Sequence, residues 1–172
     1  MKRADVFFDV VKARRSVRSF TDAPVPREVL EKIVSAGIEA PTGCNAQLKQ
    51  YIIVDDPAVL DAIRFASPAL KTARATIVLV MDPQPTKYGT FWMQDASAAM
   101  ENMLLAAVAL GYAACWVEGA IRHAEEELRE ILGVPERLRV WSLLPVGKPA
   151  EKPGRPPKPE PDEVIHVNRF AT

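Results

Sequence analysis

Four residues near the start of the chain carry its clearest chemical signal: Arg14, Arg15, Ser16 and Arg18. The arginine guanidinium is a planar set of donors that matches a phosphate or carboxylate, and a serine hydroxyl adds one more donor. The whole chain holds 22 Lys and Arg against 22 Asp and Glu. Because that balance is neutral, the cluster is no by-product of a basic composition. It predicts an anion site or, alternatively, a solvated face that pairs with acidic side chains.

A second candidate segment begins at Pro41, Thr42 and Gly43, where turn residues predict a loop. Asn45 and Gln47 place two side-chain amides in and just after this loop. Such amides either cap the loop locally or donate and accept hydrogen bonds from a ligand.

No metal or disulfide framework is expected from the remaining reactive side chains. Cys44 and Cys115 are the only cysteines and lie far apart, so we interpret both as ordinary thiols. His123 and His166 lack partners at metal-ligand spacing, which favours surface or structural roles for both.

Length and composition limit the classes of protein to which the chain can belong. A chain of 172 residues, 48% hydrophobic and 26% charged, fits one globular domain. Its neutral balance argues against a general nucleic-acid or membrane-surface role. No stretch approaches the roughly 18 to 20 apolar residues that span a bilayer. The apolar run near the N-terminus is broken by Asp5 and Asp9, unlike a signal peptide, so we expect a cytoplasmic protein.

Hydrophobic spacing and breaker residues predict alternating helices and strands. The run at 92–110 is apolar around so much of its circumference that it should be the central buried helix. The helices are expected at 5–13, 26–40, 58–66, 92–110 and 125–132, and the strands at 51–54, 75–81, 113–117, 138–146 and 164–167.

The segment 148–163 has a different character, with six prolines and four Lys or Arg among its sixteen residues. Proline at this density excludes a helix or central strand. In a polyproline conformation the segment would reach on the order of 50 Å. It is therefore either a disordered segment kept soluble by its basic residues or an arm that wraps something.

Five segments in this order make the chain resemble the FMN-dependent nitroreductase family over nearly its full length. The cluster at 14–18 resembles the family's N-terminal phosphate and ribityl motif, and the segment 117–119 resembles its turn at the flavin edge. The remaining segments are the loop at 40–47, the central helix at 95–111 and the arm at 157–165.

The resemblance implies an α+β sandwich in which helices flank a central, mostly antiparallel sheet. It further implies a homodimer with exchanged C-terminal arms and two FMN sites at the interface. Residues 1–147 would form the FMN-binding core. Residues 148–172 would form a proline-rich arm and terminal strand that complete the same domain on the partner subunit.

The resemblance also implies a set of cofactor-binding residues. Arg14, Arg18 and Lys158 would neutralise the FMN phosphate, and the Gly119 N–H would approach flavin N5 with no side chain in the way. Glu118 lines the same turn or, alternatively, only pairs with a nearby arginine. The full set is Arg14, Arg15, Ser16, Arg18, Pro41, Thr42, Asn45, Gln47, Glu118, Gly119, Arg155 and Lys158.

The activity implied by the resemblance is a ping-pong cycle in which NAD(P)H reduces FMN and a nitroaromatic, quinone or similar acceptor is then reduced. Flavin N5 carries the hydride, so no protein acid or base is expected. Alternatives are another FMN reaction, such as reductive dehalogenation or flavin cleavage, and a non-catalytic FMN-binding protein. Lys49 stands where the family often has an aromatic residue, and the loop at 83–91 is too short for a large lid.

Overall fold

A four-stranded antiparallel sheet forms the centre of the molecule, in the order β1-β2-β4-β3. The computed structural model describes residues 3–170. The first two residues of the expected core (1–147) and the last two of the expected arm (148–172) lie outside this range. The strands are β1 (Lys49–Val54), β2 (Ala75–Met81), β3 (Ala113–Ala114) and β4 (Arg139–Gly147).

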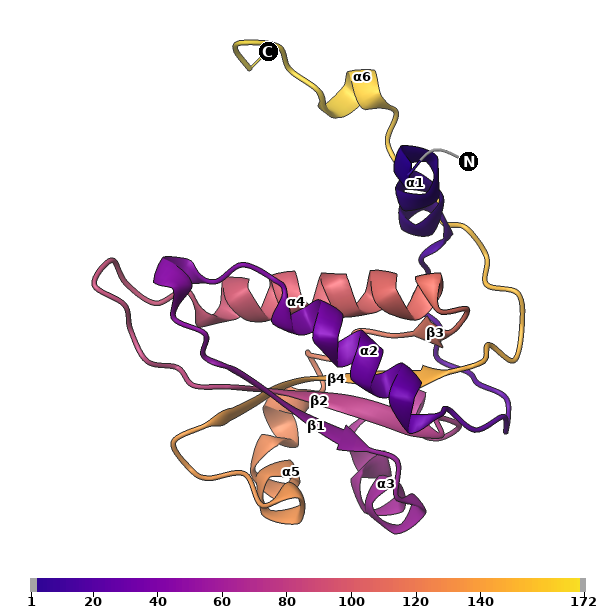
Figure 1. The fold of residues 1–172 in the computed structure, drawn as a ribbon, viewed down its shortest axis with the longest axis vertical. Coiled ribbons are helices and arrows are strands. Elements are labelled where there is room, and N and C mark those ends of the chain that lie inside the picture. The colour runs from indigo at the N-terminus through magenta and orange to yellow at the C-terminus, as the bar shows by residue number, and fades with distance from the viewer. Residues whose placement is uncertain (1–2, 171–172) are drawn as a thin grey trace.

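Helices cover both faces of this sheet, with α2 and α4 on one face and α3 and α5 on the other (Figure 1). The expected α+β sandwich with a central antiparallel sheet is therefore confirmed. The helices are α1 (Arg3–Ala13), α2 (Arg27–Ile38), α3 (Pro57–Ile63), α4 (Trp92–Ala109), α5 (Glu125–Leu132) and α6 (Pro161–Val164), with short 3₁₀ turns between them.

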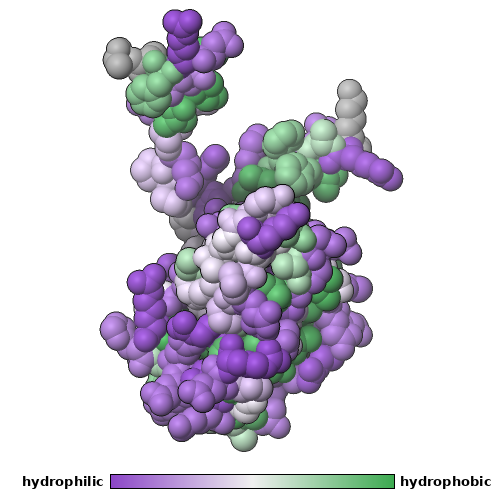
Figure 2. Space-filling model, turned by 90° about the vertical axis from the view of Figure 1, so that its left-hand side faces the viewer, coloured by the Kyte–Doolittle hydropathy of each residue, from purple (hydrophilic) through white to green (hydrophobic). Residues whose placement is uncertain are grey.

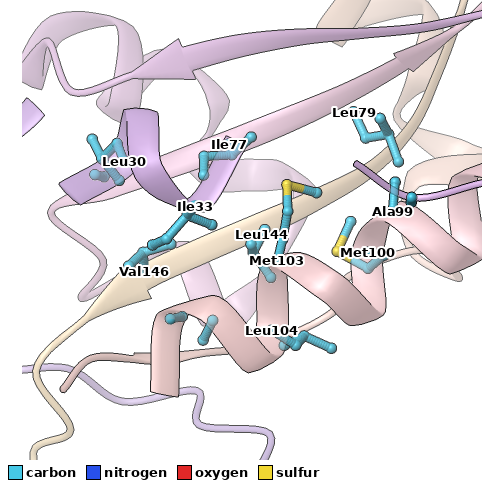
Figure 3. Packing of buried hydrophobic residues seen from close by; sticks show 14 of the residues in the cluster. Leu30, Ile33, Ile77, Leu79, Ala99, Met100, Met103, Leu104, Leu144 and Val146 are labelled. Carbon is cyan, nitrogen blue, oxygen red and sulfur yellow. The ribbon is translucent and has the colours of Figure 1, made fainter. Parts of the chain in front are cut away.

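The central strand β2 is buried at every residue, so its side chains feed two separate hydrophobic cores. Ile77 and Leu79 point toward α2 and α4, while Val78 points toward α3 and α5, as the period of two in a strand requires. Figure 3 shows the first core, where side chains of α2, β2, β4 and α4 meet. Met100 and Met103 of α4 are fully buried there, which confirms α4 as the central buried helix.

Two segments depart from the body. Helix α1 has no buried residue, and the chain after β4 runs alongside it before it reaches α6 and continues to the C-terminal end (Figure 1). Every described residue from 151 to 170 is exposed. Both segments therefore lie outside the two cores.

The predicted strand at 164–167 is wrong. Residues Pro161–Val164 form the helical turn α6 instead, and no strand follows it up to residue 170. Local capping explains the difference, because the backbone N–H of Glu160 donates to the Glu163 carboxylate at 2.8 Å and Pro161 begins the turn. The strand expected at 113–117 is also shorter than predicted: β3 ends at Ala114, and Val117 forms only an isolated bridge to Leu143.

Candidate functional site

The arginine cluster is anchored to the edge of the sheet. Ser16 forms a parallel bridge with Ala114 of β3, and the Val17 N–H donates to the Ala114 carbonyl at 3.0 Å. Val17 itself is buried, which fixes the backbone while the neighbouring Arg18 side chain stays exposed. The edge of the sheet thus holds the backbone of the cluster in place, while the Arg18 side chain remains exposed to solvent.

A cavity of about 830 Å³ lies between this cluster and the proline-rich arm. Residues 11–19 form one side of the cavity and residues from Glu151 to Lys158 form the other. Seven cationic side chains line it, against one carboxylate, Glu151. The cations are Lys12, Arg14, Arg15, Arg18, Lys152, Arg155 and Lys158.

Two of these arginines are already engaged by the protein. Arg14 Nε lies 3.3 Å from the Glu101 carboxylate of α4. Arg15 donates from Nε to the Gly154 carbonyl at 3.2 Å and from Nη1 to the Lys12 carbonyl at 2.7 Å. Arg15 therefore ties the arm to the end of α1 and shapes the cavity.

The remaining cations are available to an anion. No ion pair to Arg18, Arg155 or Lys158 is formed within residues 3–170. A phosphate monoester carries close to two negative charges at neutral pH. The cavity therefore offers these three cationic groups, together with Lys12, Lys152 and the Ser16 hydroxyl, to a doubly charged ligand.

The arm reaches the cluster of its own chain. Within the described residues of one chain, the arm and the cluster supply the two sides of the cavity. The exchange of arms between subunits that the resemblance implies stays a prediction. The site residues Arg14, Arg15, Ser16, Arg18, Arg155 and Lys158 are thus brought together by the single subunit.

The second candidate loop has an unusual backbone. Cys44, Asn45 and Gln47 adopt φ angles of 57°, 54° and 53°, the left-handed region that favours glycine. Each such residue costs on the order of 1 kcal/mol or more and is typical of functional loops, where the surroundings hold the strain. The amides meet locally, because Gln47 Nε2 donates to Asn45 Oδ1 at 2.6 Å. Pro41 and Thr42 precede them, and Thr42 Oγ1 accepts from Gln47.

This loop packs tightly against the start of α4. The Gly43 N–H donates to Asp95 Oδ1 at 2.8 Å. A Cβ added to Gly43 would lie 2.7 Å from Phe91 Cβ, so only glycine allows this approach. The loop is therefore attached to the N-terminal end of the central helix.

One chain does not bring the loop and the cavity together. Figure 1 shows the chain after α2 running to the N-terminal end of α4, whereas α1 and β3 lie near its C-terminal end. Helix α4 has 18 residues and is about 27 Å long. Within one subunit, the loop that carries Asn45 and Gln47 thus lies apart from the cavity that Arg18 and Lys158 line.

The turn at Glu118 and Gly119 follows the bridge between Val117 and Leu143. The Glu118 carbonyl accepts from the Ile121 N–H at 2.9 Å, which closes the turn. No heavy atom lies within 4 Å of a Cβ built on Gly119. The open space on the side-chain side of the exposed Gly119 leaves room for a flat ligand beside this turn.

The two cysteines lie in opposite environments, and we expect them to react at very different rates. Cys44 is exposed on the strained loop, while Cys115 is buried. Burial raises the pKa of the Cys115 thiol, and the nearby Arg18 charge opposes that rise. Because the thiolate is the reactive form, iodoacetamide should label Cys44 at least about 100-fold faster. Peptide mass spectrometry measures both rates. Equal labelling in the native protein would contradict the buried position of Cys115.

Several residues at these sites were not predicted from the sequence. Lys12 and Lys152 line the cavity, Glu101 holds Arg14, and Asp95 holds the loop. Their basic or acidic character alone gave no signal, since each acts through a contact between distant parts of the chain.

Within residues 3–170 no group of three or more His, Cys, Asp or Glu could hold a metal ion. In the same range no helix is long and apolar enough to cross a membrane.

Comparison with known proteins identifies the family of this chain. The family model described as "Nitroreductase family" matches residues 11–74 and 64–148. A chain of Archaeoglobus fulgidus, provisionally named an NADH dehydrogenase/NAD(P)H nitroreductase, is 38% identical over 83% of this chain and 85% of its own.

Solved structures agree with this result. A protein of Bacteroides thetaiotaomicron with the same provisional name has a TM-score of 0.85 and 30% identity, covering 99% of this chain and 100% of its own. An FMN-dependent nitroreductase of Clostridium difficile has a TM-score of 0.80 and 28% identity, covering 95% and 99%. The chain belongs to the nitroreductase family.

Proposed function

We propose that the protein is an FMN-dependent oxidoreductase that uses NAD(P)H to reduce nitroaromatics, quinones or similar acceptors. The cationic cavity carries the proposal, because Arg18, Arg155 and Lys158 offer unpaired positive charges suited to the FMN phosphate. The FMN-dependent relative of the same fold supports this choice of ligand. Cytoplasmic localisation is part of the proposal.

Different residues of the chain bind different parts of the cofactor. Arg18, Arg155 and Lys158 bind the phosphate, while Ser16 donates a hydroxyl and Arg15 keeps the arm in place. When bound, FMN supplies the acceptance and donation of hydride. The protein contributes binding, orientation and positive charge.

The flavin-side contacts come from two further segments. In this proposal the turn formed by the partly buried Glu118 and the exposed Gly119 contacts the flavin edge. Asn45 and Gln47 offer amides to ribityl hydroxyls or ring atoms, with Pro41 and Thr42 setting the approach of that loop. Because the loop and the cavity lie near opposite ends of α4, the loop that completes a site belongs to a second copy of the chain.

A homodimer also accounts for the segments that leave the body. An isolated helix of 11 residues is marginal in water, yet α1 buries none of its side chains within its own chain. Figure 2 shows hydrophobic side chains gathered on both projecting segments. Phe7 and Phe8 are each 57% exposed, and Ile165 and Phe170 are 62% and 79% exposed. We assign residues 1–147 to the core and 148–172 to an arm, which lines the cavity of its own chain as far as Lys158 and packs on the partner subunit beyond it.

The proposed substrates follow from the shape of the surroundings. The loop between β2 and α4 is short, so no extra helical lid covers the site. A site of this kind admits flat acceptors of several shapes, and reductant and acceptor use it in turn in a ping-pong cycle.

The first experiment is the visible absorption spectrum of the purified protein, before and after adding FMN. We expect a bound flavin spectrum that NADH or NADPH bleaches under anaerobic stopped flow and that a nitroaromatic or quinone restores. A protein that stays colourless with FMN would contradict the proposal. Tight FMN binding without bleaching would identify a non-catalytic flavin protein, and reoxidation only by halogenated phenols would identify a dehalogenase.

A further inference from the structure

Two charged side chains outside the proposed set of cofactor ligands lie at the base of the loop 41–47. Asp95 of α4 is only 5% exposed, and Lys49 of β1 is partly buried. Charged residues are rarely buried unless a partner compensates for the loss of water. The partner of each one is backbone, just before the loop for Lys49 and within the loop for Asp95.

Lys49 holds the beginning of the loop. Its Nζ donates to the Ala40 carbonyl at 2.6 Å and lies 3.4 Å from the Ile38 carbonyl. These carbonyls stand at the C-terminal end of α2, where backbone acceptors lack helical partners and positive charge is favoured. Burial lowers the pKa of Lys49, while the Asp95 and Glu39 carboxylates oppose that change.

Asp95 holds the middle of the loop. Its Oδ1 accepts the Gly43 N–H at 2.8 Å, and its carboxylate stands in the first turn of α4, where negative charge is favoured. Phe91 packs against Gly43 from the same side and leaves no room for a Cβ. The loop is thus fixed at Ala40 and again at Gly43.

The strained residues come directly after these two fixed points. Cys44, Asn45 and Gln47 all have positive φ. Such conformations persist only where the surrounding structure determines them. We infer that Lys49 and Asp95 are positioning residues that hold loop 41–47 in the conformation that presents Asn45 and Gln47 to the flavin. This inference rests on the proposed function, because it takes FMN as the ligand of the loop.

The test compares Asp95→Ala, Asp95→Asn and Lys49→Met in the full-length protein. We expect Asp95→Ala and Lys49→Met to weaken FMN and riboflavin equally, by about 10-fold. The ratio of the two dissociation constants should stay as in the parent, because the phosphate cavity is intact. Asp95→Asn keeps an acceptor oxygen and should recover most of the affinity. Asp61→Ala and Lys32→Met remove the same charges from exposed helical positions and serve as matched controls.

A readout that needs no flavin keeps the inference separate from the proposed function. Amide hydrogen exchange of residues 41–47 should be about 10-fold faster in Asp95→Ala than in the parent. Unchanged exchange and unchanged affinity for both flavins would overturn the inference. A loss confined to FMN would overturn it too, since the effect would then act through the phosphate. If the parent binds no FMN, the proposed function fails, and unchanged exchange in the variant would still overturn the loop attachment.

Discussion

We expect the parent chain to form a dimer and protein carrying Phe7→Glu and Phe8→Glu to behave as a 19.0 kDa monomer. Both phenylalanines lie on α1, each is 57% exposed, and their rings contact each other edge to face. Burying one such side chain contributes about 1.5 to 3 kcal/mol. A two-fold interface counts each residue twice, and 57% of each side chain remains to be buried, so the four changes remove about 3 to 7 kcal/mol of association free energy.

Sedimentation velocity over a range of concentrations measures this change directly. Phe65→Glu is the matched control, because Phe65 is 47% exposed on the body of the molecule, outside α1 and the arm. We expect the control to remain dimeric. The double variant should also lose FMN binding, since a monomer cannot supply the second loop. A double variant that stays dimeric would show that α1 is not part of the interface.

The elements that the sequence predicted well are those whose burial is complete or whose ends are marked locally. The strand expected at 75–81 is β2, and all seven of its residues are buried in the two cores. The helix expected at 125–132 is α5, which ends at Gly133 in the left-handed conformation that glycine favours. In both cases hydrophobic spacing and end signals agree with the tertiary environment.

The terminal strand was mispredicted because a strand is defined by its partner. Val164, Ile165 and Val167 have the β-branched character of a strand, but no sheet edge of the same chain pairs with them up to residue 170. Without that pairing, the hydrogen bonds between Glu160 and Glu163 decide the local conformation. Propensity in a short segment is a weak predictor when pairing is absent.

The candidate site could be predicted only in part from the sequence, for a related reason. Arg14 to Arg18 are adjacent in the sequence, so their shared chemistry is visible without a structure. The contact between Arg15 and Gly154, by contrast, joins residues 139 positions apart. The roles of Lys49 and Asp95 likewise depend on where α2 ends and α4 begins. Contacts of this kind follow from packing, which composition and periodicity do not specify.

The double variant Arg18→Ala/Lys158→Ala is expected to bind FMN about 100- to 10,000-fold more weakly than the parent. Each side chain lines the cavity, and neither forms an ion pair within residues 3–170, so each is free to contact the phosphate. A hydrogen bond to a charged group contributes about 1.5 to 3 kcal/mol, and two such losses give the stated range. Arg14→Ala should have a smaller effect, because its guanidinium already pairs with Glu101.

Riboflavin separates the phosphate contribution from every other contact. Its affinity should be unchanged in the double variant, because it has the ring and ribityl chain but no phosphate. Lys32→Ala/Arg137→Ala removes the same two charge types from exposed positions that do not line the cavity and should leave FMN affinity as in the parent. Rising salt should weaken FMN but not riboflavin in the parent, since screening acts on the charged group. Equal loss of both flavins in the double variant would mean that the cluster and arm shape the fold of the site rather than bind its anion.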